Sequence, residues 1–163
     1  LSLHDALPIY ELVYRNLSED AKRQICAWKY GGEYDLYNLP AYEEMQVRQI
    51  GFMNPQREKN YYGFWDESIL VGFVNILEEK EEVFIGIGVN PDLCNKHYGQ
   101  RMLLITYEIS KKLYPNKPLY LEVRTWNIRA VKCYQKAGFR IDGQAYELTT
   151  GIGTGTFYRM IRE

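Results

Sequence analysis

A strand, a helix and a second strand follow one another between residues 82 and 126, and this order constrains the fold more than any other feature. β-Branched and aromatic residues dominate EVFIGIGV (82–89) and PLYLEVRTW (118–126), which is typical of strands. The intervening helix, near residues 99–113, has an apolar face formed by Met102, Ile105, Ile109 and Leu113. A helical crossover returns the chain in its original direction, so the sequence predicts a parallel strand pair in an α/β (α+β) fold.

The remaining segments predict further strands and helices around this unit. Short polar turns separate the strand-like segments 60–66, 69–79 and 82–89, which predicts an antiparallel meander. Before the meander we expect a strand over 10–16, a helix over 19–28 with Ser18 as its N-cap, a loop over 29–40 and a short helix over 41–50. After residue 126 we expect a helix that Asn127 opens and Gly138 closes, and then two terminal strands in 139–148 and 154–162.

Length and composition limit the classes of function. The chain has 163 residues, 46% of them hydrophobic, which is enough for one packed domain that we expect over residues 10–163. Residues 1–9, LSLHDALPI, are a candidate non-native leader. The formal net charge of -1 removes the simplest argument for nucleic-acid binding, and no apolar run is long enough to span a membrane. Three scattered cysteines give no disulfide framework or metal motif, which favours a reducing cytoplasm.

The segment LEVRTWNIRAVKCYQKAGF (121–139) is the most specific motif of the chain. It fits the spacing N-x-x-A-x-x-x-Y-x-x-x-G-F at Asn127, Ala130, Tyr134, Gly138 and Phe139. With the preceding strand and helix, it resembles the GNAT superfamily of acetyl-CoA-dependent N-acetyltransferases, and locally the ribosomal-protein alanine acetyltransferases. The resemblance implies a GNAT fold: a mixed, mostly antiparallel sheet of six to seven strands, with a splayed parallel pair and about four flanking helices.

The junction CNKHYGQRM (94–102) follows a strand and precedes a helix, where backbone N–H groups attract anions. By itself it equally fits an ordinary connection. The resemblance places the family's pyrophosphate loop, Q/R-x-x-G-x-G/A, on Cys94 to Gly99, with Cys94 and His97 departing from the pattern. It implies acetyl-CoA as co-substrate, without a metal, and contacts from Ile87, Gly88, Val89, Cys94, Asn95, Lys96, His97, Tyr98, Gly99, Gln100, Arg101, Asn127, Ala130 and Tyr134. Lys96 and Arg101 could offset the missing glycine with positive charge.

Two side chains are candidates for moving protons during amine acetylation. The resemblance assigns Tyr134 as general acid for the departing thiolate, although a tyrosine on an amphipathic helix also suits a core. It suggests Glu122 as general base. The alternatives are a solvent-facing Glu122 paired with Arg124, or a water chain as base. An acyl-cysteine at Cys133 would need an adjacent activating base, which the sequence does not offer.

Acidic and aromatic residues alternate in the segment 31–47, which has no Lys or Arg. Such a wall would favour a cationic amine, and Glu33, Tyr34, Asp35 and Tyr37 are the candidate acceptor-binding residues. A solvated acidic surface with tyrosines packed beneath it is the alternative. The sequence therefore predicts direct acetyl transfer to a primary amine, on a small cationic molecule or on a peptide, by a monomer or homodimer. A noncatalytic CoA-binding sensor with the same fold is the rival.

Overall fold

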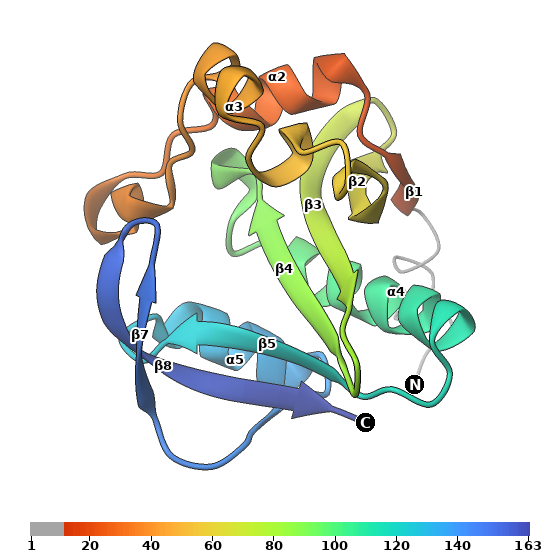
Figure 1. Cartoon of the computed structure of the whole chain (residues 1–163), viewed down its shortest axis with the longest axis vertical. Coiled ribbons are helices and arrows are strands. Elements are labelled where there is room, and N and C mark those ends of the chain that lie inside the picture. Colours follow the sequence, from red (N-terminus) through yellow and green to blue (C-terminus); the bar gives the residue numbers. More distant parts are fainter. Residues whose placement is uncertain (1–11) are drawn as a thin grey trace. The chain divides into compact units, whose positions relative to one another are not determined.

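A computed structural model describes residues 12–163 of the chain. The candidate leader and the first two residues of the expected strand over 10–16 lie outside this range. The strands are β1 (Leu12–Asn16), β2 (Tyr61–Asp66), β3 (Ile69–Glu78), β4 (Val83–Val89), β5 (Leu119–Arg124), β6 (Arg140–Ile141), β7 (Tyr146–Thr150) and β8 (Gly153–Arg162) (Figure 1). The helices are α2 (Glu19–Ala27), α3 (Tyr42–Arg48), α4 (Tyr98–Leu113) and α5 (Ile128–Lys136), with 3-10 turns at η2 (Gly32–Tyr37), η3 (Gly51–Met53), η4 (Glu58–Asn60) and η5 (Pro91–Leu93).

The described chain divides into two units. Unit 1 contains residues 12–75 and Ile87–Tyr98, and unit 2 contains Ile76–Gly86 and Gly99–Glu163. Hydrogen-bonded neighbours follow the order β1-β2-β3-β4-β5-β8-β6, and β7 also pairs with β8. The sheet therefore has eight strands in the described residues, where the sequence predicted six to seven.

Unit 1 is built on an antiparallel meander. β1 pairs with β2 from Leu12–Asp66 to Asn16–Tyr62, and β2 pairs with β3 through a bulge between Phe64 and Trp65. The antiparallel pairing of β2 with β3, the first two strands of the predicted meander, is confirmed, and β4 is the next neighbour of β3 in the sheet. Its strands, α2 and α3 enclose one apolar cluster, which contains Leu17, Ala21, Ile25, Cys26, Tyr42, Met45, Phe52, Trp65 and Leu70.

The helices of unit 1 show which local signals the sequence contains. Ser18 caps α2 as predicted, because its Oγ accepts a hydrogen bond from the N–H of Ala21 at 3.1 Å. The expected loop over 29–40 is a wrong prediction at η2. This 3-10 turn is held by backbone hydrogen bonds within the segment, such as that from Asn38 N–H to Asp35 C=O at 3.0 Å. It therefore forms without a periodic apolar face. Periodicity therefore could not reveal this turn.

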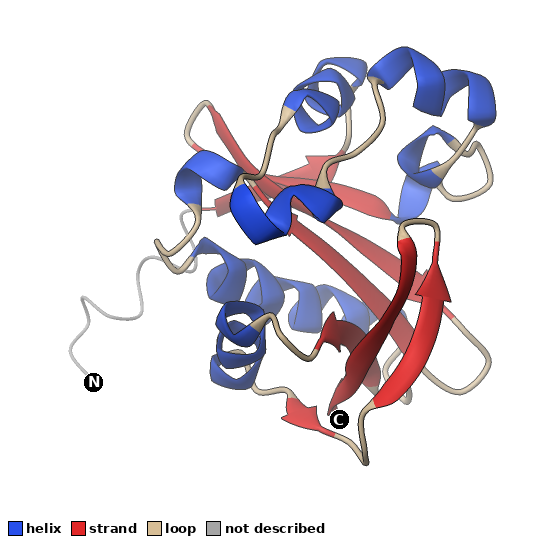
Figure 2. Ribbon diagram, turned by 90° about the vertical axis from the view of Figure 1, so that its left-hand side faces the viewer, coloured by secondary structure: helices blue, strands red, loops and turns tan. Residues whose placement is uncertain are grey.

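Unit 2 contains the predicted parallel pair. β4 joins β5 through Val83–Leu119 and Phe84–Tyr120, the first two residues of each strand, which agrees with a pair that splays beyond this point. β5 pairs antiparallel with β8 along its whole length, from Leu119–Arg162 to Arg124–Phe157. Figure 2 shows α4 and α5 on the same face of these strands.

Two details of unit 2 differ from the sequence prediction. The expected strand over 139–148 is divided into β6 and β7, because the chain turns at Gly143, whose φ is +77°. On α4, Met102 and Ile109 are buried as expected, but Leu113 is 50% exposed. Leu113 is the last residue of the helix, where the chain leaves the packed face.

Candidate active site

The turn before α4 has an unusual backbone. Asn95 and His97 adopt positive φ angles of 64° and 65°, a left-handed conformation that L-residues other than glycine rarely adopt. His97 occupies the position at which the pyrophosphate loop was expected to contain glycine. Residues in this conformation, alternating with others, can turn successive N–H groups toward one point and form an anion-binding concavity. The backbone thus remains glycine-like although the side chain is not glycine.

Asn90 anchors the beginning of this turn to β3. Its N–H donates to the carbonyl of Val71 at 2.9 Å, and its Nδ2 donates to the carbonyl of Leu70 at 3.1 Å. Its Oδ1 accepts from the N–H of Asp92 at 3.0 Å. The Sγ of Cys94 lies 3.7 Å from the carbonyl oxygen of Asn90. Cys94 therefore contributes to the turn's own geometry, where the family's pattern has a polar residue.

Tyr98 and Lys96 have different surroundings in this segment. The hydroxyl of Tyr98 donates to Asp66 Oδ2 at 2.5 Å, which ties the first residue of α4 to the end of β2. Lys96 and His97 are exposed, and Gly99 is buried. The lysine is thus accessible to a solvent-borne anion, whereas Gly99 is packed.

The end of β4 is fixed by two aromatic residues that the sequence analysis missed. The hydroxyl of Tyr30 donates to the carbonyl of Val89 at 2.6 Å. A Cβ at Gly88 would lie 2.4 Å from Cε1 of Phe73, so the packing of this ring requires a glycine there. The expected role of Gly88, contact with acetyl-CoA, stays a prediction beside this structural one. A glycine near the end of a strand gives no sequence signal that names its aromatic partner.

Most of the Asn127–Phe139 motif is explained by the folding of α5. The Oδ1 of Asn127 accepts from the N–H of Ala130 at 3.2 Å, so the N-x-x-A spacing is an N-cap. Gly138 ends the helix with a φ of +95°, and Phe139 is buried. Tyr134 is partly buried on this helix. Neither cap uses its phenol, and Tyr134 as general acid stays a prediction.

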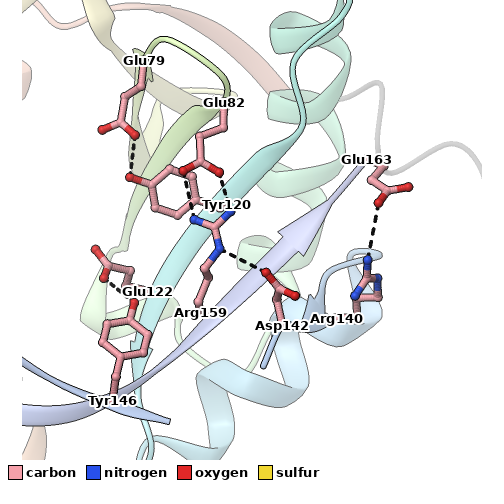
Figure 3. Close-up of polar contacts among 9 residues, drawn as sticks. All are labelled: Glu79, Glu82, Tyr120, Glu122, Arg140, Asp142, Tyr146, Arg159 and Glu163. Atoms are coloured by element: carbon pink, nitrogen blue, oxygen red, sulfur yellow. Dashed lines mark hydrogen bonds and ion pairs between the residues drawn. The ribbon is translucent and has the colours of Figure 1, made fainter. Parts of the chain in front are cut away.

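Glu122 lies on the face of β5 opposite to that of Leu121 and Val123, as strand alternation predicts. Tyr146 on β7 donates a hydrogen bond from its hydroxyl to Glu122 Oε2 at 2.5 Å (Figure 3). Arg124 has another environment, since its guanidinium lies 4.8 Å from the centroid of the Phe157 ring. The ion pairs among the described residues do not include Glu122 with Arg124. Glu122 as base stays a prediction.

Further polar contacts surround Glu122 on this face, which we call the Glu122 face (Figure 3). Tyr120 donates from its hydroxyl to Glu79 at 2.7 Å. Arg159 donates to Glu82 at 3.0 Å and to Asp142 at 3.2 Å. Burial, together with the hydrogen bond to Glu79, raises the pKa of Tyr120, and the hydrogen bonds to Glu82 raise the pKa of Arg159. The face therefore has fixed charges and phenols that stay protonated at neutral pH.

Cys133 and the expected acceptor wall are also placed by the structure. Burial raises the pKa of the Cys133 thiol, which disfavours the thiolate that an acyl-cysteine would need. Glu33 and Asp35 are exposed on η2, and Tyr34 and Tyr37 are partly buried there. The wall's other tyrosine, Tyr42, is buried and donates its hydroxyl to Glu19, so it belongs to the packing of α2 and α3.

The described residues contain neither a cluster of metal ligands nor a membrane-spanning helix. Between residues 12 and 163, no group of three or more His, Cys, Asp or Glu side chains could hold a metal ion. In the same range, no helix has the length and apolar character needed to cross a bilayer.

Comparisons with known proteins agree on one family. The model of the acetyltransferase (GNAT) family matches residues 12–139. Among solved structures, spermidine N-acetyltransferase from Vibrio cholerae in complex with CoA and spermine is similar with a TM-score of 0.75 at 18% identity, covering 94% of this chain and 95% of that one. A GNAT acetyltransferase from Bacillus anthracis gives 0.72 at 16% identity, covering 93% and 94%. No curated protein matches the sequence. The family match covers most of the chain, and the chain therefore belongs to the acetyltransferase (GNAT) family.

Proposed function

We propose that the protein is an N-acetyltransferase that moves the acetyl group of acetyl-CoA directly to a primary amine in a ternary complex. The observation that supports this most is the left-handed backbone of His97 in the turn before α4. A glycine-like conformation at the glycine position of the diphosphate loop is unexpected for a histidine unless the turn has a use for that geometry.

The residues of the turn fit a diphosphate. Asn95 and His97 have left-handed backbones, a conformation that can turn successive N–H groups toward one point. The first turn of a helix has N–H groups without partners inside the helix, and Lys96 is an exposed cation in the same turn. We propose that these groups hold the diphosphate of CoA, and that backbone groups of Ile87 and Val89 contact its pantetheine arm. When bound, acetyl-CoA supplies an activated thioester.

The reaction also needs a proton donor for the departing thiolate and a proton acceptor for the ammonium group, and side chains of this protein can fill both roles. We propose that Tyr134 donates a proton from its hydroxyl to the departing thiolate, because it occupies the tyrosine position of the family's motif within the matched residues 12–139. We propose that Glu122 accepts the proton of the acceptor ammonium at a carboxylate oxygen, directly or through water. Asn127 caps α5 and so fixes the residue at which this helix begins.

The acceptor is proposed to be a cationic amine. The similar Vibrio cholerae structure contains spermine, and exposed Glu33 and Asp35 on η2 would attract such a polycation. We favour a small polyamine-like molecule over a peptide amine. A noncatalytic CoA-binding module is the second candidate, because Cys94 and His97 both depart from the family's loop pattern.

A thiol-release assay tests the proposal with acetyl-CoA and a panel of spermidine, spermine, a lysine peptide and a peptide with a free N-terminus. We expect release with at least one amine. Tyr134→Phe should lower kcat by about 100-fold or more, the range for loss of a general acid, with CoA affinity unchanged by calorimetry. Tyr107→Phe is the matched control, because this phenol on α4 donates to the carbonyl of Glu163 and should leave kcat near that of the parent.

The assay also separates the two candidate functions. CoA binding by the parent without release on any amine would support the noncatalytic module. Equal kcat values for Tyr134→Phe and the parent would remove Tyr134 from the mechanism and leave the acetyltransferase proposal standing.

A further inference from the structure

The hydrogen bond between Tyr146 and Glu122 crosses the sheet of unit 2. Glu122 on β5 lies opposite Arg159 on β8, and Tyr146 on β7 lies opposite Phe157 on β8. Tyr146 therefore reaches over β8 to a strand with which β7 does not pair. The contact is 2.5 Å between the hydroxyl and Oε2, and it joins residues 24 positions apart in the chain.

The neighbours of Glu122 do not provide the same interaction. Arg159 is opposite it in the register, but its guanidinium donates to Glu82 and Asp142 and lies 4.4 Å from the centroid of the Tyr120 ring. Within unit 2, the charged and titratable groups that share this face are Glu79, Glu82, Tyr120, Arg124, Asp142, Tyr146 and Arg159. Among them, the structure gives Tyr146 as the hydrogen-bond donor to the Glu122 carboxylate.

We propose that Tyr146 is a positioning residue that holds the Glu122 carboxylate in one orientation, ready to accept a proton from the acceptor amine. This inference rests on the proposed function and on Glu122 as the base. A hydroxyl that donates to one carboxylate oxygen fixes the direction of the second oxygen. A general base must lie within hydrogen-bond reach of the proton that it accepts, directly or through one water, so a fixed direction favours the transfer.

The state of the phenol supports this role. Burial, and then the hydrogen bond and charge of Glu122, raise the pKa of Tyr146 above its ordinary value. The phenol therefore keeps its proton through the neutral and mildly alkaline range and remains a donor.

Tyr146→Phe removes only the hydroxyl and tests the proposal through separate values of kcat and KM. At neutral pH kcat should fall by about 10-fold with KM for the amine little changed, because the carboxylate remains but loses its fixed direction. Tyr120→Phe is the matched control: it removes another phenol-to-carboxylate hydrogen bond, to Glu79, on the same face, and should leave kcat near that of the parent.

A double-mutant comparison separates positioning from structural support. In a Glu122→Gln background, Tyr146→Phe should cause no further loss of kcat, since the carboxylate it serves is gone. If Tyr146→Phe does not fold, fluorinated tyrosine at position 146 keeps the ring and changes the strength of its hydroxyl as a donor. The value of kcat should then change, with KM for the amine little affected, and an unchanged kcat would overturn the positioning role.

The outcomes distinguish the inference from the function beneath it. A parent enzyme that releases no CoA with any amine overturns the proposed function. An active parent with the same kcat as Tyr146→Phe overturns the positioning role alone. An equal loss of kcat in Tyr120→Phe also overturns it, because the effect would then belong to the whole face.

Discussion

At the scale of single residues, His97 adopts the left-handed backbone conformation that the family's loop pattern assigns to a glycine. The φ of 65° is close to that of Asn95, two residues earlier. Asparagine tolerates this region better than histidine because its short side chain bonds locally to the backbone. Of these two residues, His97 therefore has the larger energetic cost for its left-handed backbone.

Replacing His97 with glycine should relieve that strain and tighten binding of CoA. We expect His97→Gly to hold or raise the free energy of unfolding by up to about 1 kcal/mol, as the left-handed penalty outweighs the entropy that glycine adds to the unfolded chain. Asn95→Gly should gain less. Urea unfolding gives the stability, and calorimetry the affinity for CoA. Weaker CoA binding in His97→Gly would instead mean that the imidazole itself contributes to the site.

Some residues of the site could be predicted from sequence, and others could not. Asn127, Gly138 and Phe139 form a local motif, because an N-cap, a left-handed C′ residue and a core residue lie at fixed positions around one helix. The hydroxyls of Tyr30 and Tyr146 contact residues 59 and 24 positions away. Such contacts follow from how strands are paired, and no local periodicity records them.

At the scale of elements, the sequence predicted the strands and helices whose buried residues recur at a regular spacing. The meander and the parallel pair were found because alternating or continuous apolar runs mark them. The 3-10 turn η2 and the break between β6 and β7 were not found, because both depend on backbone turns within polar segments.

The contact between β3 and the end of β4 within unit 1 can be tested at Gly88. Gly88→Ala should lower the free energy of unfolding by about 1–3 kcal/mol, since the new Cβ would overlap the ring of Phe73, which packs against Phe52 and Tyr61. Phe73→Leu in the same chain should recover part of that loss. Urea unfolding of the two single variants and the double variant measures the coupling. Additive losses would show that the effect of Gly88→Ala does not come from contact with the Phe73 ring.

At the scale of the whole molecule, ion pairs between the buried Lys22 and two exposed glutamates make the stability of the fold depend on pH. Lys22 is 2% exposed, and its Nζ contacts Glu19 at 3.0 Å and Glu58 at 2.8 Å. The hydrogen bond from Tyr42, and then that from Lys22, lowers the pKa of Glu19 below its usual 4.5. A carboxyl with a lowered pKa stabilises the fold above its unfolded value and loses this effect as pH falls through the folded value.

Glu19→Gln should therefore be less stable than the parent at neutral pH, and the difference should shrink as pH falls below 4.5. Unfolding by urea at several pH values measures this. Glu44→Gln removes an exposed ion pair with Arg48 and should show almost no difference at any pH. A Glu19→Gln penalty that persists in acid would mean that the network acts through packing rather than through charge.

The place of β8 between β5 on one side and β6 and β7 on the other has a consequence for biosynthesis. Residues 153–162 are made after every strand they join, and Arg159 meets Glu82 across a separation of 77 positions. On the ribosome, unit 2 must wait with β5 unpaired along that edge until this segment emerges, whereas the meander of unit 1 needs only earlier residues. A chain halted before residue 153 would expose that edge to chaperones and to aggregation.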